Sequence, residues 1–193
     1  MAKRQRFVYP TDEVPHLWAH KTQSEATNPR RNLYFTGDTI FSYGEHFPIA
    51  RHVTGGTKRK PLAGVLFTSR SYSSTTAKHK GKVRQSIPSN VMAFEVPNVN
   101  VWDGHSANLQ YFSNEAKRLL AKAQNGRKYG AYSWKEAQKN VANAKAYATF
   151  FRITFPTKLF KFMPKGALFT LCSMSLARGI WRAWHRGHSP QDS

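Results

Sequence analysis

Apolar residues in the first half of the chain fall into short runs separated by turn-forming residues. The runs LYF and TIFSY flank Thr36, Gly37 and Asp38, a pattern that predicts a β-hairpin. In the following run, FPIARHV, Pro48 favours an edge strand or a bulged strand. The segment TGGTKRKP predicts a flexible basic loop, and LAGVLF after it predicts a short buried strand.

A helix is expected between two buried strands of this half. After LAGVLF and a polar stretch comes AKHKGKVRQSI, in which Ala77, Val83 and Ile87 are apolar and Thr75 or Thr76 can serve as the cap. VMAFEV then reads as a second buried strand. Strand, helix and strand within about 35 residues is typical of a βαβ crossover.

The N-terminal segment is more polar. Residues 11–20 predict a short helix or turn that begins with Thr11 as its N-cap. The stretch QSEATNPRRN after it, with its Asn-Pro step, predicts a loop.

The second half has the period of helices. Apolar residues recur at spacings of three and four from residue 106 to 124, and again from Ser133 until Pro156 ends the pattern. Ser133 and Glu136 form a capping box, and the short connection predicts an antiparallel helical hairpin. The predicted outer faces carry basic residues, namely Lys117, Arg118, Lys122, Lys135, Lys139 and Lys145.

The last segment combines an apolar run with tryptophans and arginines. Its run of about eleven apolar residues is too short to span a membrane, which takes about twenty. We expect residues 166–186 to form a basic amphipathic helix that packs on the domain, with binding to a membrane surface or to nucleic acid as the alternative.

Together these patterns predict the α+β class. We expect a small mixed β-sheet with one crossover helix over residues 8–97 and an antiparallel helical hairpin packed on it over 103–155. A C-terminal basic amphipathic helix would follow in the basic, apolar tail over 156–193.

The net charge points to a polyanionic partner. The chain of 193 residues has 30 Lys and Arg against 10 Asp and Glu, a formal charge of +20. Such an excess favours binding to nucleic acid, and less often to an anionic membrane or an acidic protein. No Asp or Glu occurs between Glu45 and Glu95, although nine Lys and Arg do, and we call residues 46–94 the acid-free window.

Residues 68–84 are the best candidate for anion binding. Hydroxyl groups at the start of a helix, followed by basic side chains, supply both donors and a favourable dipole for phosphate. The predicted nucleic-acid or phosphate site consists of Arg51, His52, Arg70, Tyr72, Lys78, His79, Lys80, Lys82 and Arg84.

The strings in this half carry a resemblance. PTDEVPHLWAH, HFPIARH (residues 46–52) and YSSTTAKH (residues 72–79) resemble an uncharacterised phage and bacterial family described as a domain of unknown function. The likeness covers residues 8–97. It implies a phage or phage-derived accessory protein and implies no activity. We expect Arg51 and His52 to lie near residues 72–79.

The sequence gives less support to a catalytic function. His46, His52 and His79, with Glu45 beside the first, could form a phosphate-ester site if they converge. His16 and His20 have the four-residue spacing of a zinc pair without a glutamate or a third ligand, so we expect no metal and no cofactor. Acidic residues are too few for a metal-dependent nuclease. The His-x-Thr strings at His20 and His52 are too short to be specific.

The compartment follows from cysteine usage. Cys172 is the single cysteine, and no apolar stretch follows the basic N-terminus, so we expect a cytoplasmic protein, in the host cell if it is phage-encoded. We expect it to bind nucleic acid without catalysis. The alternatives are a nucleotide or phosphate-ester enzyme, and a host-protein interaction or anti-defence protein.

Overall fold

The computed structural model of the chain describes residues 7–125 and 130–163. It contains the helices α1 (Glu13–Ala19), α2 (Ser74–Ser86), α3 (Val101–Asn125) and α4 (Gly130–Phe151), and a short 3-10 helix η1 (Thr157–Phe160). Its strands are β1 (Glu25–Thr27), β2 (Leu33–Thr36), β3 (Thr39–Ser42), β4 (Pro48–Gly56), β5 (Pro61–Thr68) and β6 (Met92–Val96). The chain belongs to the α+β class, as the sequence predicts. The C-terminal helix expected over 166–186 lies outside the described residues.

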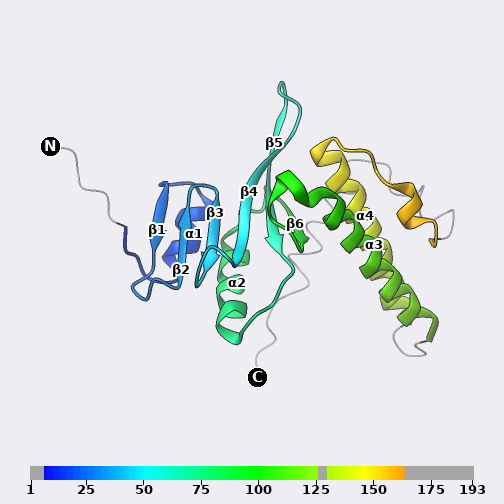
Figure 1. The fold of residues 1–193 in the computed structure, drawn as a ribbon, viewed down its shortest axis with the longest axis horizontal. Coiled ribbons are helices and arrows are strands. Elements are labelled where there is room, and N and C mark those ends of the chain that lie inside the picture. The colour runs from blue at the N-terminus through cyan, green and yellow to red at the C-terminus, as the bar shows by residue number, and fades with distance from the viewer. Residues whose placement is uncertain (1–6, 126–129, 164–193) are drawn as a thin grey trace. The chain divides into compact units, whose positions relative to one another are not determined.

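The six strands form one mixed sheet in sequence order (Figure 1). The strands β1 to β4 pair antiparallel, and β5 pairs with β6 in parallel across α2, which confirms the predicted crossover. The predicted hairpin of β2 and β3 is also present: Thr36 pairs with Thr39, and Gly37 adopts a φ of +54° in the turn. Glycine suits that turn because it has no Cβ to clash.

Three local expectations are wrong. The loop over 23–32 contains β1, whose three residues pair with β2. Thr11 does not cap α1, because its hydroxyl accepts a hydrogen bond from Asn28 Nδ2 and the helix begins after Asp12. Ser133 does not head a capping box, because α4 begins three residues earlier at Gly130.

Pro48 is the first residue of a strand, a position that proline tolerates although it has no N–H group to donate. It opens β4, where it pairs with Phe41, and the register shifts between Ile40 and Phe41. This irregularity confirms the predicted bulge and leaves Ile49 and Ala50 both buried. The edge position is wrong, because β4 lies between β3 and β5.

Contacts divide the chain into two compact units. The sheet unit comprises Met1–Thr54 and Ala63–Trp102, and the helical unit comprises Gly55–Leu62 and Asp103–Ser193. In the sheet unit, α1 and α2 pack on each other and cover one face of the sheet. Its core is a single cluster of buried side chains: Val14, Trp18, Ala19, Ala26, Leu33, Phe35, Ile40, Ile49, Ala50, Val65, Phe67, Val83 and Ile87.

The helical unit has its own core. The buried Tyr147 of α4 lies against Phe112 of α3, and its hydroxyl accepts a hydrogen bond from Asn108 Nδ2 at 3.0 Å. His105 Nδ1 lies 2.9 Å from the same oxygen. The segment after α4 folds back onto α3, where Ser113 Oγ donates to the carbonyl oxygen of Leu159 at 2.7 Å. No helix within the described residues is long and apolar enough to cross a membrane.

Candidate nucleic-acid interface

The strings HFPIARH and YSSTTAKH, together with the residues just before the first, meet in space. Ser42 Oγ at the end of β3 lies 2.8 Å from His79 Nδ1 in α2, and both side chains are buried. The Tyr43 ring lies 6.1 Å from the imidazole of His79, and the Phe47 ring lies 6.1 Å from the ring of Tyr72. These contacts join the loop after β3 both to α2 and to the loop that precedes α2. They therefore anchor α2 at this end of the sheet.

A tight loop makes this meeting possible. The N–H of Ser42 donates to the carbonyl of Phe47 at 3.1 Å, and the N–H of Phe47 donates to that of Gly44 at 3.0 Å. Tyr43 closes the turn with a φ of +63°, which L-residues other than glycine seldom adopt. The residue is 53% exposed.

The pair of Ser42 and His79 is not arranged as a nucleophile with its base. Ser42 is 1% exposed and His79 is 4% exposed, so no substrate atom could approach the hydroxyl. Burial lowers the pKa of His79 and so favours the neutral imidazole, which can share one hydrogen bond with the serine. We therefore assign this pair to the packing of α2 on the sheet.

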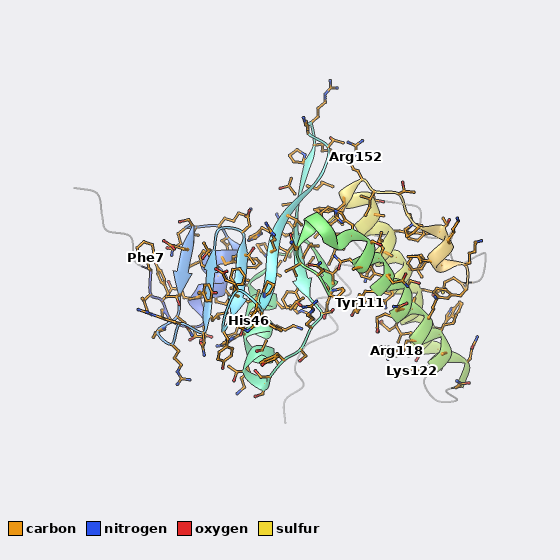
Figure 2. All side chains as sticks on the ribbon, in the orientation of Figure 1. Phe7, His46, Tyr111, Arg118, Lys122 and Arg152 are labelled. Atoms are coloured by element: carbon orange, nitrogen blue, oxygen red, sulfur yellow. The ribbon has the colours of Figure 1, made fainter. Side chains whose placement is uncertain are left out.

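The other catalytic candidates have different neighbours. His52 Nε2 lies 2.9 Å from the carbonyl oxygen of Trp18, and its ring lies tilted against that indole, with the centroids 4.2 Å apart. Burial lowers the pKa of His52, more than its hydrogen bond to Trp18 raises it. His46 and Glu45 are exposed in the loop after β3 (Figure 2). Thus His52 is held at α1 whereas His79 is held at β3.

The described side chains lack the grouping that a metal site requires. Among the described residues, no group of three His, Cys, Asp or Glu side chains could hold a metal ion. His16 and His20 do lie together, with ring centroids 4.2 Å apart.

Most of the nine predicted binding residues have structural partners. Arg51 Nη1 donates to Asn100 Oδ1, while His52 and His79 have the partners described above. Lys82 pairs with Asp12, and Arg84 Nη2 lies 2.5 Å from Glu95 Oε2. Asp12 and Glu95 both lie outside the acid-free window. A window without acids in the sequence is therefore not free of acids in space.

Lys80 and Arg84 help to build the end of the sheet. Both cations lie over the buried Phe67 ring, 5.5 and 4.7 Å from its centroid. Lys80 Nζ donates to the carbonyl oxygen of Arg70 at 2.7 Å, which fixes the loop after β5. Burial, assisted by the charge of Arg84 and opposed by that of Glu95, lowers the pKa of Lys80.

The predicted anion-binding loop remains a candidate in part. Ser73 caps α2 by accepting a hydrogen bond from the N–H of Thr76 at 3.2 Å, so neither predicted threonine is the cap. The first turn of α2 contains no acidic residue. Arg70, Tyr72 and Lys78 are exposed, and these three of the nine predicted residues remain accessible to a ligand.

A basic hairpin tip lies within the acid-free window, between the predicted binding residues His52 and Arg70. The strand β4 leaves its β3 partner after Arg51, and β5 meets β6 from Gly64 onward, so the residues between continue as a two-stranded ribbon (Figure 1). Two backbone hydrogen bonds of 3.1 Å between Thr57 and Lys60 close it. We call residues 57–60, TKRK, the basic tip.

All three cations of the basic tip are available. Lys58, Arg59 and Lys60 are exposed, and none has an ion-pair partner within the described residues. Residues 57–60 lie outside the strands, as the predicted loop requires, but they form the closed turn of a hairpin, and the strands β4 and β5 extend into the rest of the predicted loop. The sequence contains one indication of this hairpin: only four residues separate two segments that both form strands.

The ribbon is fixed to α4 within the helical unit. A Cβ added to Gly55 would lie 2.4 Å from the carbonyl oxygen of Phe150 and 2.6 Å from its ring. Gly56 has a φ of +76°, which suits glycine. The close approach at Gly55 leaves no room for a side chain, so this glycine allows the strand to lie against α4.

The cations of the helical hairpin are mixed in character. Arg118 makes a bidentate bond to Glu115, which raises the pKa of the guanidinium, and Lys139 lies 3.6 Å from Glu136. Lys117 lies over the Phe162 ring at 5.3 Å. Lys122, which Figure 2 shows on α3 beyond Arg118, is exposed and has no ion pair within the described residues. The same is true of Lys135 in α4.

Comparisons of the chain with protein-family models, with curated proteins and with solved structures gave no significant match. The resemblance of residues 8–97 to a phage family therefore stays a prediction. The function is argued from the residues alone.

Proposed function

We propose that the protein binds nucleic acid without catalysis and holds its phosphate backbone with exposed Lys and Arg side chains. The observation that carries this proposal is the basic tip. Three adjacent cations stand at the end of a two-stranded ribbon and lack carboxylate partners among the described residues. Cations in this state release counterions from a phosphate backbone when they bind it.

The form of the ribbon suits a duplex. A two-stranded β-ribbon is one of the two elements that fit the major groove, and arginine is the side chain most often found in narrow minor grooves. The contact of Gly55 with Phe150 holds the base of the ribbon, so less order has to be gained on binding.

Further support comes from residues of the predicted site and of the helical hairpin. Arg70 and Lys78 in the sheet unit, and Lys122 and Lys135 in the helical unit, are exposed and unpaired within the described residues. They extend the positive surface of each unit. This surface complements a phosphate backbone and supplies no catalytic group.

The test is a binding titration against labelled DNA and RNA duplexes at several salt concentrations. Replacing the three tip cations, as K58Q/R59Q/K60Q, should lower the slope of log affinity against log salt by about two to three, close to 0.9 per phosphate contact. The matched control is K21Q/R30Q/R31Q, which removes the same charge from exposed positions of the sheet unit.

Each outcome has a clear meaning. A wild-type protein that binds no DNA or RNA at moderate ionic strength, or binds with no dependence on salt, overturns the proposal. Equal loss in the two triple variants would mean that net charge acts and that the tip has no special part. A partner protein that is retained from nuclease-treated lysate while nucleic acid fails to bind would favour the host-protein alternative.

A further inference from the structure

Three aromatic rings at one end of the sheet unit are accessible to a ligand. Tyr72 is 80% exposed and Tyr43 is 53% exposed. Phe47 is half-buried: it packs against the core of the sheet unit and lies 6.1 Å from the ring of Tyr72. We call Tyr43, Phe47 and Tyr72 the aromatic platform. Such rings are normally buried, so their exposure requires an explanation.

The backbone under the platform is fixed. On one side, the loop from Ser42 to Phe47 is closed by two backbone hydrogen bonds, and the N–H of Tyr43 donates to the carbonyl of Asn32 at 2.9 Å. On the other side, the N–H of Ser69 donates to the carbonyl of Val96 at 2.8 Å, and Lys80 holds the carbonyl of Arg70.

Strain also marks the platform as a built surface. A positive φ is unfavourable at a bulky residue such as Tyr43 and persists only where the surroundings impose it. Asparagine or glycine would close the same turn at lower cost. The Tyr43 ring, whose centroid lies 6.1 Å from that of the His79 imidazole, is the feature that asparagine or glycine would not supply.

The charges near the platform favour an anionic ligand. Arg70 precedes Tyr72 by two residues and Lys78 lies in the second turn of α2; both are exposed and have no ion pair within the described residues. Glu45, which is exposed in the loop between Tyr43 and Phe47, is the one acidic residue of that loop. Its position makes it a probe for the charge of the ligand.

We propose that the aromatic platform stacks the unpaired bases of single-stranded nucleic acid, with Arg70 and Lys78 contacting the adjacent phosphates. This inference rests on the proposed function and names a second surface and a second form of its ligand. Base stacking on aromatic side chains tolerates any sequence, because every base presents a π-face, and a basic surround holds the backbone. The basic tip and the platform would then serve duplex and single strand respectively.

The experiment measures the binding of a labelled single-stranded oligonucleotide of about 20 nucleotides, long enough for one site. Tyr72→Ala should weaken its binding about tenfold, the loss expected for one stacked base. Tyr72→Phe keeps the ring and should recover most of that loss. The control is Tyr132→Ala, which removes a tyrosine of similar exposure (66%) from α4 and should change nothing.

Two further probes separate stacking from charge. Inorganic polyphosphate offers charge without bases, so Tyr72→Ala should leave its binding unchanged. Glu45→Gln should tighten the binding of the oligonucleotide about threefold, because it removes a charge that would repel phosphates bound beside the platform. A gain of affinity cannot result from a folding defect.

The results distinguish this inference from the proposed function. Suppose that the tip variant loses duplex binding while Tyr72→Ala leaves single-strand binding intact. This result overturns the role of the aromatic platform and leaves the proposed function standing. Equal losses of oligonucleotide and polyphosphate binding in Tyr72→Ala also overturn the role of the platform. If the wild-type protein binds neither form, the proposed function fails first and the platform with it.

Discussion

The α2 segment of the sheet unit and the basic tip of the helical unit hold their positive charge in different ways. The sheet unit has 12 Lys and Arg against 6 Asp and Glu, whereas the helical unit has 18 against 4. In the sheet unit, Lys21, Lys82 and Arg84 pair with carboxylates, and Lys80 bonds a carbonyl group. In the basic tip of the helical unit, three adjacent cations have no such partner among the described residues.

This difference teaches that a basic segment is not the same as a basic surface. The acid-free window runs through both units, yet its part in α2 meets Asp12 and Glu95, while its part at the tip meets no acid in the described chain. Charges attract according to their distance in space. Only those cations that the fold leaves unpaired contribute fully to binding a polyanion.

The largest expected effect concerns the joint between the ribbon and α4. Gly55→Ala would place a methyl group within 2.4 Å of the Phe150 carbonyl oxygen and should destabilise the helical unit by about 3 kcal/mol, the upper end for overpacking. Amide hydrogen exchange reads the two units separately and should show the loss in the helical unit.

The matched control is Gly81→Ala in α2. A Cβ at Gly81 meets nothing within 4 Å, and alanine favours a helix, so this variant should gain about 0.5–1 kcal/mol in the sheet unit. Equal behaviour of the two alanine variants would contradict the close approach of the ribbon to Phe150.

The next effect tests the anchor of α2. His79→Ala removes the imidazole that lies 2.8 Å from Ser42 Oγ and leaves that hydroxyl buried without a partner, which should cost about 2 kcal/mol. Urea denaturation measures the loss. In the double variant with Ser42→Ala, the orphaned hydroxyl is gone, so part of the stability should return; a purely additive result would argue against the pair.

A pH effect should appear in both units. Burial lowers the pKa of His52, His79 and His105 below the ordinary value of 6.5. The unfolded chain then binds more protons than the folded chain in acid, so the free energy of unfolding should fall as the pH drops below about 6.5. Thermal unfolding between pH 7.5 and 5 checks this, and stability that rises on acidification would contradict it.

The smallest expected effect comes from removing the carboxylate partner of Lys82, a paired cation of the sheet unit. Asp12→Asn frees Lys82 from its exposed ion pair, so stability should change by less than about 0.5 kcal/mol. Binding of duplex DNA at low salt should tighten about twofold, since one more cation becomes available. Asp12→Glu keeps the charge and is the control; identical affinities for the two variants would show that pairing with Asp12 does not limit Lys82.

Much of the fold could be predicted from local patterns. The run LAGVLF is apolar throughout and VMAFEV is apolar except for Glu95, as expected of largely buried strands, and the helix between them allows the two strands to pair in parallel. The apolar stripes of α3 and α4 gave the helical hairpin. The strand β1 was missed because its three residues carry no period and acquire their structure by pairing with β2.

The candidate site was less predictable. Arg70, Tyr72 and Lys78 are exposed as expected, and the basic tip lies outside the strands as expected, but the continuation of β4 as far as Gly56 was not predicted. Here Gly55 stays in the strand because Phe150, some ninety-five residues away in sequence, lies against it. No local pattern contains such a contact.

The sequence by itself determined the class of the fold, the crossover, the helical hairpin and the total charge of +20. These depend on periodicity and composition, which are local or additive properties. Only the tertiary structure decided which cations stay available, that Ser42 reaches His79, and that Tyr43, Phe47 and Tyr72 share one end of the sheet unit. These depend on distances between residues remote in sequence, and packing sets those distances.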